Sequence, residues 1–342
     1  MTVDIVAVDP LDPTQAELFA GWRAVLEAST RLEYGDDHSV YSADEYRAKF
    51  RNQHYERRTA WVAQVGGEVV GHLEVGLPLN DNTHRVDFTL AVHPDHRRKG
   101  IGSTLLETLE RLAHDKGRTV LGVESDVAAG HDDPAEGFAG RHGYLAAQRD
   151  LRSTLTLPIR PDELAAARAD AEQHADGYET LTSWDGIPDG WLADRAELSR
   201  RMSTDAPLGQ IDMNEQEWDG ERVRRNVELA LEQGRRLVET VARHRATDRL
   251  IAFTTMAVSQ DNPDAAYQWD TLVLREHRGH RLGLLVKAVN LRALITQLPN
   301  VRRIHTWNAT ENEPMLRVNR ALGFAPVGQA TEWQKTLTSS GG

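Results

Sequence analysis

The feature that most constrains this fold is a short loop, closed by glycine, that occurs twice. Residues 97–102 read RRKGIG and residues 278–283 read RGHRLG, and their closing glycines lie 181 residues apart. A glycine-aromatic pair follows each loop, and these pairs lie 180 residues apart: Gly143-Tyr144 and Gly323-Phe324. Because the interval from loop to pair agrees within one residue, the sequence predicts an internal duplication, which determines the architecture of the whole chain.

Hydrophobic periodicity predicts the same order of elements in both halves. In the first half it predicts helices at 15–28, 44–51, 103–117 and 134–143, and strands at 3–8, 59–65, 68–77, 85–92 and 119–125. The segment 144–157 is predicted as a closing hairpin. In the second half it predicts helices at 192–201, 217–233, 282–298 and 313–323, and strands at 178–184, 235–242, 250–258, 266–274 and 301–307.

This order predicts an α/β fold of two similar domains. We expect the first domain at residues 1–158 and the second at 177–342. Residues 159–176 contain a charged, alanine-rich segment that is typical of a helical connector.

Composition limits the possible functions. The chain has 342 residues, a net charge of -12 and no cysteine, which excludes thiolate metal sites and a cysteine nucleophile. The acidic balance disfavours nucleic-acid binding and suits a cationic acceptor. No apolar run reaches the roughly 18 residues of a membrane span, and the N-terminus lacks a basic region before an apolar stretch. We therefore expect a cytoplasmic monomer or homodimer with no membrane partner.

Each loop joins a predicted strand to a predicted helix, an arrangement that suits phosphate binding. The first N–H groups of a helix have no partner within the helix and lie at the positive end of its dipole. In the first loop, Gly100 and Gly102 allow close approach, while Arg97, Arg98 and Lys99 add positive charge. A solvated helix start is the alternative, but it does not account for the repetition. Neither a dinucleotide fingerprint nor a Walker loop is present.

These segments resemble the GNAT superfamily of acetyl-CoA-dependent N-acetyltransferases. The likeness is carried by AVHPDHRRKGIGSTLL with FAGRHGY in the first half, and by TLVLREHRGHRLGLLVK with NATENEPMLRVNRALGF in the second. The two-module layout is similar to that of actinobacterial mycothiol-synthase-like acetyltransferases. The resemblance implies two tandem GNAT folds, each a mixed, mostly antiparallel, splayed sheet flanked by helices.

The resemblance also implies where coenzyme A binds. Its pantetheine would pair with the strand before each loop, and its pyrophosphate would lie on the loop N–H groups. The implied cofactor residues of the first half are Leu90, Ala91, Val92, Arg97, Arg98, Lys99, Gly100, Ile101, Gly102 and Ser103. Those of the second half are Leu272, Val273, Arg278, Gly279, His280, Arg281, Gly283 and Asn312. For Asn312, helix capping is an equal alternative.

The two copies differ at two places. Gly100 of the first loop aligns with Arg281 of the second, and an arginine there either obstructs the cofactor or bends outward and adds charge. The first loop is therefore the favoured cofactor site. Many family members also place a tyrosine four residues before the glycine-aromatic pair, as an acid for the leaving thiolate. This chain has Ala139 and Asn319 there, which puts that role in doubt in both halves.

Four residues are candidates for catalysis: Glu124, Asp87, Asp270 and Asn319. A carboxylate near the cleft would accept the proton of the amine. Solvated strand faces or ion pairs are the alternative for the carboxylates. His277 and His280 with Glu276 resemble a zinc pattern, but phosphate binding accounts for them better, so no metal is expected. The tryptophans of the second half, including Trp218 and Trp269, belong either to the core or to a wall for a bulky acceptor.

The sequence thus predicts an acyltransferase that moves acetyl from acetyl-CoA to a primary amine of a small molecule, by direct attack in a ternary complex. The alternative is a non-catalytic acyl-CoA-binding or scaffold protein with one or both modules degenerate.

Overall fold

The computed structural model describes residues 2–35 and 40–337, which form two compact units. Unit 1 contains the chain up to Arg149, the short segment Gln210–Met213 and the chain from Gln329 onward. Unit 2 contains Asp150–Gly209 and Asn214–Gly328.

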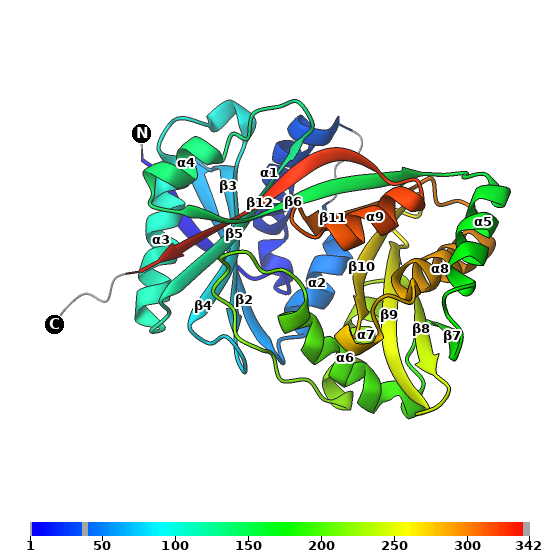
Figure 1. Cartoon of the computed structure of the whole chain (residues 1–342). Helices are drawn as coiled ribbons and strands as arrows, with labels where there is room; N and C mark the ends of the chain where they lie inside the picture. Colours follow the sequence, from blue (N-terminus) through cyan, green and yellow to red (C-terminus); the bar gives the residue numbers. More distant parts are fainter. Residues whose placement is uncertain (1, 36–39, 338–342) are drawn as a thin grey trace. The chain divides into compact units, whose positions relative to one another are not determined.

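Unit 1 is a sheet with strand order β1-β2-β3-β4-β5-β12 (Figure 1). Neighbouring strands from β1 to β4 pair antiparallel, and β4 pairs parallel with β5. Its strands are β1 (Asp4–Val8), β2 (Glu56–Val65), β3 (Glu68–Pro78), β4 (Arg85–Val92) and β5 (Val120–Ala128). Its helices are η1 (Pro13–Gln15), α1 (Ala16–Tyr34), α2 (Ala43–Arg51), η3 (Pro94–His96), α3 (Ile101–Asp115) and α4 (Glu136–Arg141).

The sheet of unit 1 has apolar layers on both faces because β2 alternates between them. Ala60 and Val62 pack with the α1 and α2 side chains, which include Trp22. Trp61 and Ala63 instead belong to the layer under α3. Successive side chains of a strand point to opposite faces. Helices α1 and α2 therefore cover one face and α3 covers the other (Figure 1).

Unit 2 repeats this plan with strand order β6-β11-β10-β9-β8-β7. Its pairs are antiparallel except for β10 with β11. Its strands are β6 (Leu145–Thr156), β7 (Tyr178–Trp184), β8 (Arg235–His244), β9 (Arg249–Ser259), β10 (Ala265–Val273) and β11 (Arg303–Ala309). Its helices are α5 (Pro161–Glu172), η4 (Asp189–Trp191), α6 (Leu192–Asp205), α7 (Gly220–Glu232), η5 (Arg275–His277), α8 (Leu282–Gln297) and α9 (Glu313–Ala321).

The helices of unit 2 also cover both faces of its sheet. Two consecutive residues of β8 show this: Glu239 bonds Arg195 of α6, and Thr240 bonds Asn290 of α8. Helix α8 is buried nearly all round because α5 packs on its outer side. The predicted α/β fold, with a mixed, mostly antiparallel arrangement of strands flanked by helices in each unit, is confirmed; the strands of both units belong to one 12-stranded sheet.

Two long strands contribute to both units, which the sequence does not predict. Strand β6 leaves unit 1 at Arg149, and its residues from Asp150 pair antiparallel with β11. The last strand, β12 (Ala325–Thr336), begins in unit 2 but lies beside β5 of unit 1 from Gln329 (Figure 1). Each unit is thus completed by a strand from the other half of the chain.

This exchange corrects one prediction and changes the limits of the domains. Residues 144–157 are not a hairpin: they contain neither glycine nor proline, and residues 145–156 form the single strand β6. The compact units also differ from the predicted contiguous domains 1–158 and 177–342. The predicted connector, residues 159–176, contains α5, whose Leu164 and Ala171 are buried in the core of unit 2.

Candidate functional site

In both units the two parallel central strands separate after three residue pairs. Strand β4 pairs with β5 from Arg85 to Asp87, and β10 pairs with β11 from Ala265 to Tyr267. Beyond these pairs, β4 and β10 continue toward the loops. The strand residues with implied cofactor roles lie in these diverging stretches: Leu90, Ala91, Val92, Leu272 and Val273. Their backbone faces a partner strand on one side only, so the other side can pair with an extended ligand.

The loops have the same backbone path although their sequences differ. The first contains two left-handed residues, Arg98 (φ 63°) and Gly100 (φ 85°). The second contains Gly279 (φ 91°) and Arg281 (φ 53°) at the matching positions. Each loop therefore has one glycine and one arginine in the left-handed region, in opposite order. An arginine in this conformation costs about 1 kcal/mol, so the shared path is maintained against local preference.

Arg281 bends outward rather than across the loop. Its guanidinium forms an ion pair with Asp170 of α5. An added Cβ at Gly100 or at Gly279 would meet nothing within 4 Å, so both loops are open at these positions. Helices α3 and α8 also begin without a side-chain cap, in contrast to α2, α7 and α9. Both helix starts can therefore offer N–H groups to an anion.

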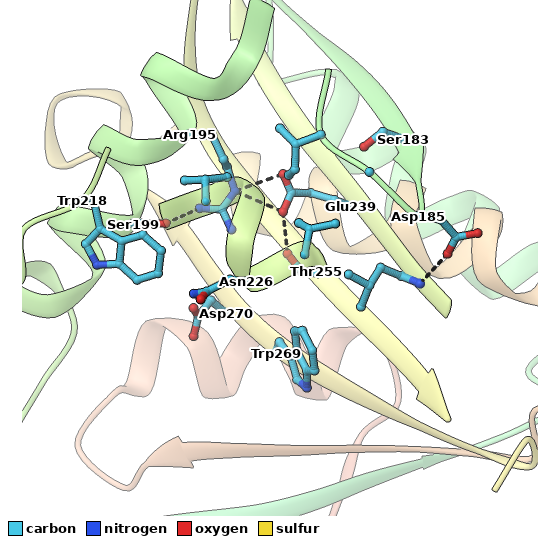
Figure 2. A pocket seen from close by; sticks show the side chains of 15 residues that line it. Ser183, Asp185, Arg195, Ser199, Trp218, Asn226, Glu239, Thr255, Trp269 and Asp270 are labelled. Atoms are coloured by element: carbon cyan, nitrogen blue, oxygen red, sulfur yellow. Dashed lines mark hydrogen bonds and ion pairs between the residues drawn. The ribbon is translucent and has the colours of Figure 1, made fainter. Parts of the chain in front are cut away.

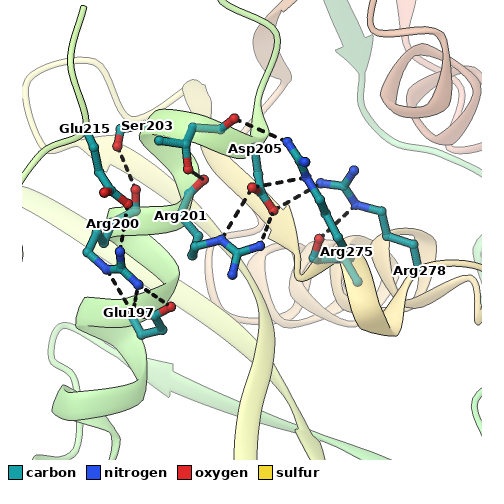
Figure 3. A network of polar contacts seen from close by, with 10 residues as sticks. Glu197, Arg200, Arg201, Ser203, Asp205, Glu215, Arg275 and Arg278 are labelled. Atoms are coloured by element: carbon teal, nitrogen blue, oxygen red, sulfur yellow. Dashed lines mark hydrogen bonds and ion pairs between the residues drawn. The ribbon is translucent and has the colours of Figure 1, made fainter.

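The leading arginines anchor the loops to the strands that precede them. Nε of Arg97 donates to the Val92 carbonyl at 3.4 Å, and Nε of Arg278 donates to the Val273 carbonyl at 3.1 Å. Arg97 also bonds Ser29 of α1. Arg278 lies 3.7 Å from Asp205 at the end of α6, which also pairs with two further arginines, Arg201 and Arg275 (Figure 3). These guanidinium groups connect the end of β4 to α1 in unit 1 and the end of β10 to α6 in unit 2.

The other loop residues of the first unit lie close to the helix start. Lys99 donates to the Asp95 carbonyl at 2.9 Å. Ile101 and Gly102 begin α3, and a Cβ at Gly102 would lie 3.3 Å from the Phe138 ring. Ser103 Oγ lies 3.0 Å from Nε2 of His142. In the second unit, His280 and Gly283 lie in the loop and in the first turn of α8.

Unit 2 contains a pocket between the sheet and the α6–α7 side (Figure 2). Two of its lining residues form an ion pair: Nε of Arg195 donates to both oxygens of Glu239 at 3.0 Å. Ser199 and Thr255 complete this network at 2.6 and 2.8 Å. The other lining residues are Ser183, Asp185, Gly186, Ile187, Trp218, Val223, Asn226, Val227, Leu237, Trp269 and Asp270.

Asp270 reaches this pocket because β10 is irregular. The register with β9 shifts between Gln268 and Thr271, so the consecutive residues Trp269 and Asp270 both line the pocket. Asp270 is exposed to solvent in the pocket, and the protein groups packed around it partly desolvate its carboxyl. This desolvation raises the pKa of its carboxyl; Arg195 lowers it and Glu239 raises it. A carboxylate with a raised pKa in a pocket is suited to accept a proton.

The other catalytic candidates lie elsewhere. Asp87 forms an ion pair of 2.7 Å with Arg85, and Glu124 is exposed on β5 in unit 1. Asn319 is buried in unit 2, and its Nδ2 donates to Oδ1 of Asn308 at 2.6 Å. Asn312 caps α9 by accepting from the N–H of Met315, as the capping alternative predicts. Of the four candidates, only Asp270 lines the pocket.

The sequence analysis did not identify the ion pair of Arg195 and Glu239 that lines the pocket. Arg195 and Glu239 lie 44 residues apart and belong to no motif. An acid within the apolar run RRLVETVA of β8 was the available signal, because a buried charge requires a partner. No helix among the described residues is long and apolar enough to span a membrane. No cluster of three or more metal-ligating side chains occurs in residues 2–35 and 40–337.

Comparisons with known proteins place this geometry in context. Residues 22–144 match the model of the acetyltransferase (GNAT) family. The mycothiol acetyltransferase of Parafrankia sp. (strain EAN1pec) is 32% identical over 144 residues, which cover 40% of this chain and 39% of that protein.

Solved structures match over nearly the whole chain. A tandem GNAT protein from the clavulanic acid biosynthesis pathway has a TM-score of 0.79 at 26% identity, covering 99% of this chain and 100% of that one. A GCN5-related N-acetyltransferase from Sphaerobacter thermophilus has a TM-score of 0.64 at 15% identity, covering 98% and 96%. The second match shows the fold alone. The predicted tandem GNAT fold is confirmed.

Proposed function

We propose that this chain, a tandem GNAT protein whose residues 22–144 form a GNAT acetyltransferase domain, is an acetyl-CoA-dependent N-acetyltransferase acting on a primary amine of a small molecule. The observation that carries the proposal is the diverging strand pair that leads into an open loop and an uncapped helix, present in both units. One side of β4 and β10 suits the pantetheine amides, and the loop N–H groups suit the pyrophosphate.

Acetyl-CoA would supply an activated acetyl thioester. The amine nitrogen attacks the thioester carbonyl, the C–N bond forms, and the C–S bond breaks without an acyl-enzyme. We assign Asp270 as the base that takes the proton lost by the amine, because it is the candidate carboxylate that lines a pocket. Water is the proton source for the thiolate, since Ala139 and Asn319 occupy the positions where many relatives have tyrosine.

The non-catalytic alternative rests on one observation. Asn319 is buried and bonded to Asn308, so neither unit offers an acidic side chain at that position. Tight binding of acetyl-CoA without thiol release across a broad panel of primary amines would favour that alternative.

The test is calorimetric titration of acetyl-CoA into four variants of the full chain. Gly100→Glu and Gly279→Glu put a negative charge on the first and second loop. Gly117→Glu and Gly177→Glu are matched controls, because these glycines also have positive φ and open surroundings but lie outside the loops. We expect two equivalents to bind to the wild type and to both controls, and one to each loop variant. Binding that is unaffected by either loop variant contradicts the proposed cofactor sites.

A further inference from the structure

The two units have a glutamate at the same place on the sheet. Strand pairing places Glu74 of β3 and Thr255 of β9 at matching positions, since both lie three residues beyond the partner of the last β4 or β10 residue. The β2–β3 register pairs Glu74 with Ala60, and the β8–β9 register pairs Glu239 with Thr255. Each unit therefore has one glutamate and one small residue in this cross-strand pair, in opposite order.

In unit 1 the chain itself occupies the space beside this glutamate. Nζ of Lys49 donates to Glu74 at 2.8 Å, and Arg58 donates to the same oxygen at 3.0 Å. Nζ also lies 5.1 Å from the ring centre of Tyr41 and 5.7 Å from that of Tyr46. A primary ammonium ion is thus held by a carboxylate and two aromatic rings, a favourable setting for a cation.

In unit 2 the corresponding space is a pocket. Helix α7, the counterpart of α2, contributes Val223, Asn226 and Val227 to the lining, and no lysine is among the lining residues. The guanidinium of Arg195 is committed to Glu239 and also lies over the Phe253 ring at 3.5 Å.

The charges of this lining favour a cation. Three carboxylates line the pocket. Asp185 is paired with Arg236 at 2.6 Å and Glu239 with Arg195 at 3.0 Å, so Asp270 is the lining carboxylate whose charge is not balanced by an ion pair among the described residues. Figure 2 draws the Asp270 side chain between those of Trp218 and Trp269. The guanidinium of Arg222 lies 4.6 Å from the Trp218 ring centre, and that of Arg235 lies 5.8 Å from the Trp269 ring centre, so a cation in the pocket would use the other faces of these rings. With those faces the pocket offers a carboxylate and two aromatic rings, as the Lys49 site does, and no lysine lines it.

We propose that the pocket of unit 2 binds the acceptor as a primary alkylammonium ion between Asp270 and the indoles of Trp218 and Trp269, and that Lys49 closes the equivalent site of unit 1. The acetylation part of this inference rests on the proposed function, whereas the binding part does not. The acceptor class follows from the lining: an aliphatic amine whose amino group, like that of lysine, is separated by several methylenes from any anionic group. The α-amino group of an amino acid does not fit this class, because the carboxylate on the same carbon would lie close to Asp270.

Binding is tested on the full chain with n-butylammonium, and n-butanol serves as the neutral isostere. Ligand-observed NMR gives Kd for the wild type, Asp270→Asn and the exposed-loop control Asp261→Asn. We expect binding of n-butylammonium to the wild type and the control, at least about tenfold weaker binding to Asp270→Asn, and weaker binding of n-butanol to the wild type. Equal affinity of n-butylammonium for wild type and Asp270→Asn, or no binding, overturns the proposed site.

The closed site of unit 1 is tested by chemical rescue. Lys49→Ala removes the atoms of n-propylamine from the Glu74 site. We expect n-propylammonium to raise the Tm of Lys49→Ala by more than that of the wild type, and n-propanol to have no such effect. An equal shift in both proteins overturns the assignment of Lys49 as an occupant.

A thiol-release assay with n-butylamine and acetyl-CoA separates the two proposals. Release that is lost in Asp270→Asn and kept in Lys49→Met supports both. Release that persists in Asp270→Asn leaves the proposed acetyl transfer standing, and it overturns both Asp270 as the base and the pocket of unit 2 as the acceptor site. Acetyl-CoA binding without release from any amine overturns the proposed function, while the NMR titration still decides whether the pocket takes alkylammonium ions.

Discussion

Unit 1 and unit 2 use the same sheet position in different ways. In unit 1 a carboxylate, two tyrosine rings and a lysine form a closed, satisfied group. In unit 2 the glutamate is paired with Arg195, and an irregular strand adds Asp270 beside an open pocket. The comparison teaches that a duplicated fold can keep its strand order while a few side chains and one irregular strand distinguish an open pocket from a packed cluster.

The largest expected effect comes from removing the open carboxylate. Asp270→Asn should lower kcat about 10²- to 10⁴-fold, because loss of a general base has this effect. In the wild type, kcat/KM should fall as pH decreases through the pKa of Asp270, and it should do so at a higher pH than for an ordinary aspartate, because that pKa is raised. Thiol release measured across a range of pH gives both the loss of kcat in Asp270→Asn and the pH profile of the wild type. A wild-type rate in Asp270→Asn would remove the functional difference between the units.

The second prediction concerns a lysine buried in unit 2 where unit 1 has leucine. Lys287 is 1% exposed, and burial lowers its pKa to about 7. Between pH 7 and pH 10.5 the unfolded chain binds a proton that the folded chain does not, so the free energy of unfolding should rise with pH in this window.

Replacement by the residue of unit 1 tests this. Lys287→Leu should remove that pH dependence and increase the free energy of unfolding below pH 7 by several kcal/mol, since a tenfold change in an equilibrium constant corresponds to about 1.4 kcal/mol. Urea unfolding at pH 6 and pH 9 measures it. Lys99→Leu, on the exposed first loop, is the control. An unchanged pH profile contradicts the prediction.

A smaller effect is expected from breaking the closed group of unit 1. Lys49→Met should lower the free energy of unfolding by about 1–3 kcal/mol, because Glu74 keeps Arg58 but loses one charged hydrogen bond. Urea unfolding measures the change. Arg168→Met removes an exposed ion pair with Glu172 and should have less than about 1 kcal/mol of effect. Similar losses in both variants would mean that the Lys49 site contributes no more than a surface pair.

The smallest effect should come from the loop of unit 2. Arg281→Gly relieves about 1 kcal/mol of backbone strain but loses the exposed pair with Asp170, so stability should change by less than about 1 kcal/mol. Calorimetry should give an unchanged number of bound acetyl-CoA molecules. A gain of a second equivalent only in Arg281→Gly would mean that the arginine obstructs the cofactor and that the units differ there as well.

Local patterns made much of the fold predictable. Repeated loops identified the two units, and helix periodicity located α3 and α8, because these signals depend on neighbours in sequence. The cap of α9 by Asn312 was also within reach, since capping acts over three residues.

The pocket could not be predicted in the same way. The pair Arg195–Glu239 joins a helix to a distant strand, and the irregularity at Trp269 depends on packing against β9. Neither contact leaves a periodic trace in the sequence. Glu74 lies on β3, whereas Glu239 lies on β8, which corresponds to β2, so an alignment of the halves does not match them.

The exchange of β6 and β12 also determines when the sheet of unit 1 can be completed during synthesis. Unit 1 contains the chain up to Arg149 but also the chain from Gln329 onward, so its sheet lacks a strand while the intervening residues are being added. At typical elongation rates this interval lasts roughly 10–40 s. During this time the open edge of β5 has no final partner and is exposed to chaperones and to other nascent chains. A gene divided at the sequence midpoint would leave that edge unpaired permanently.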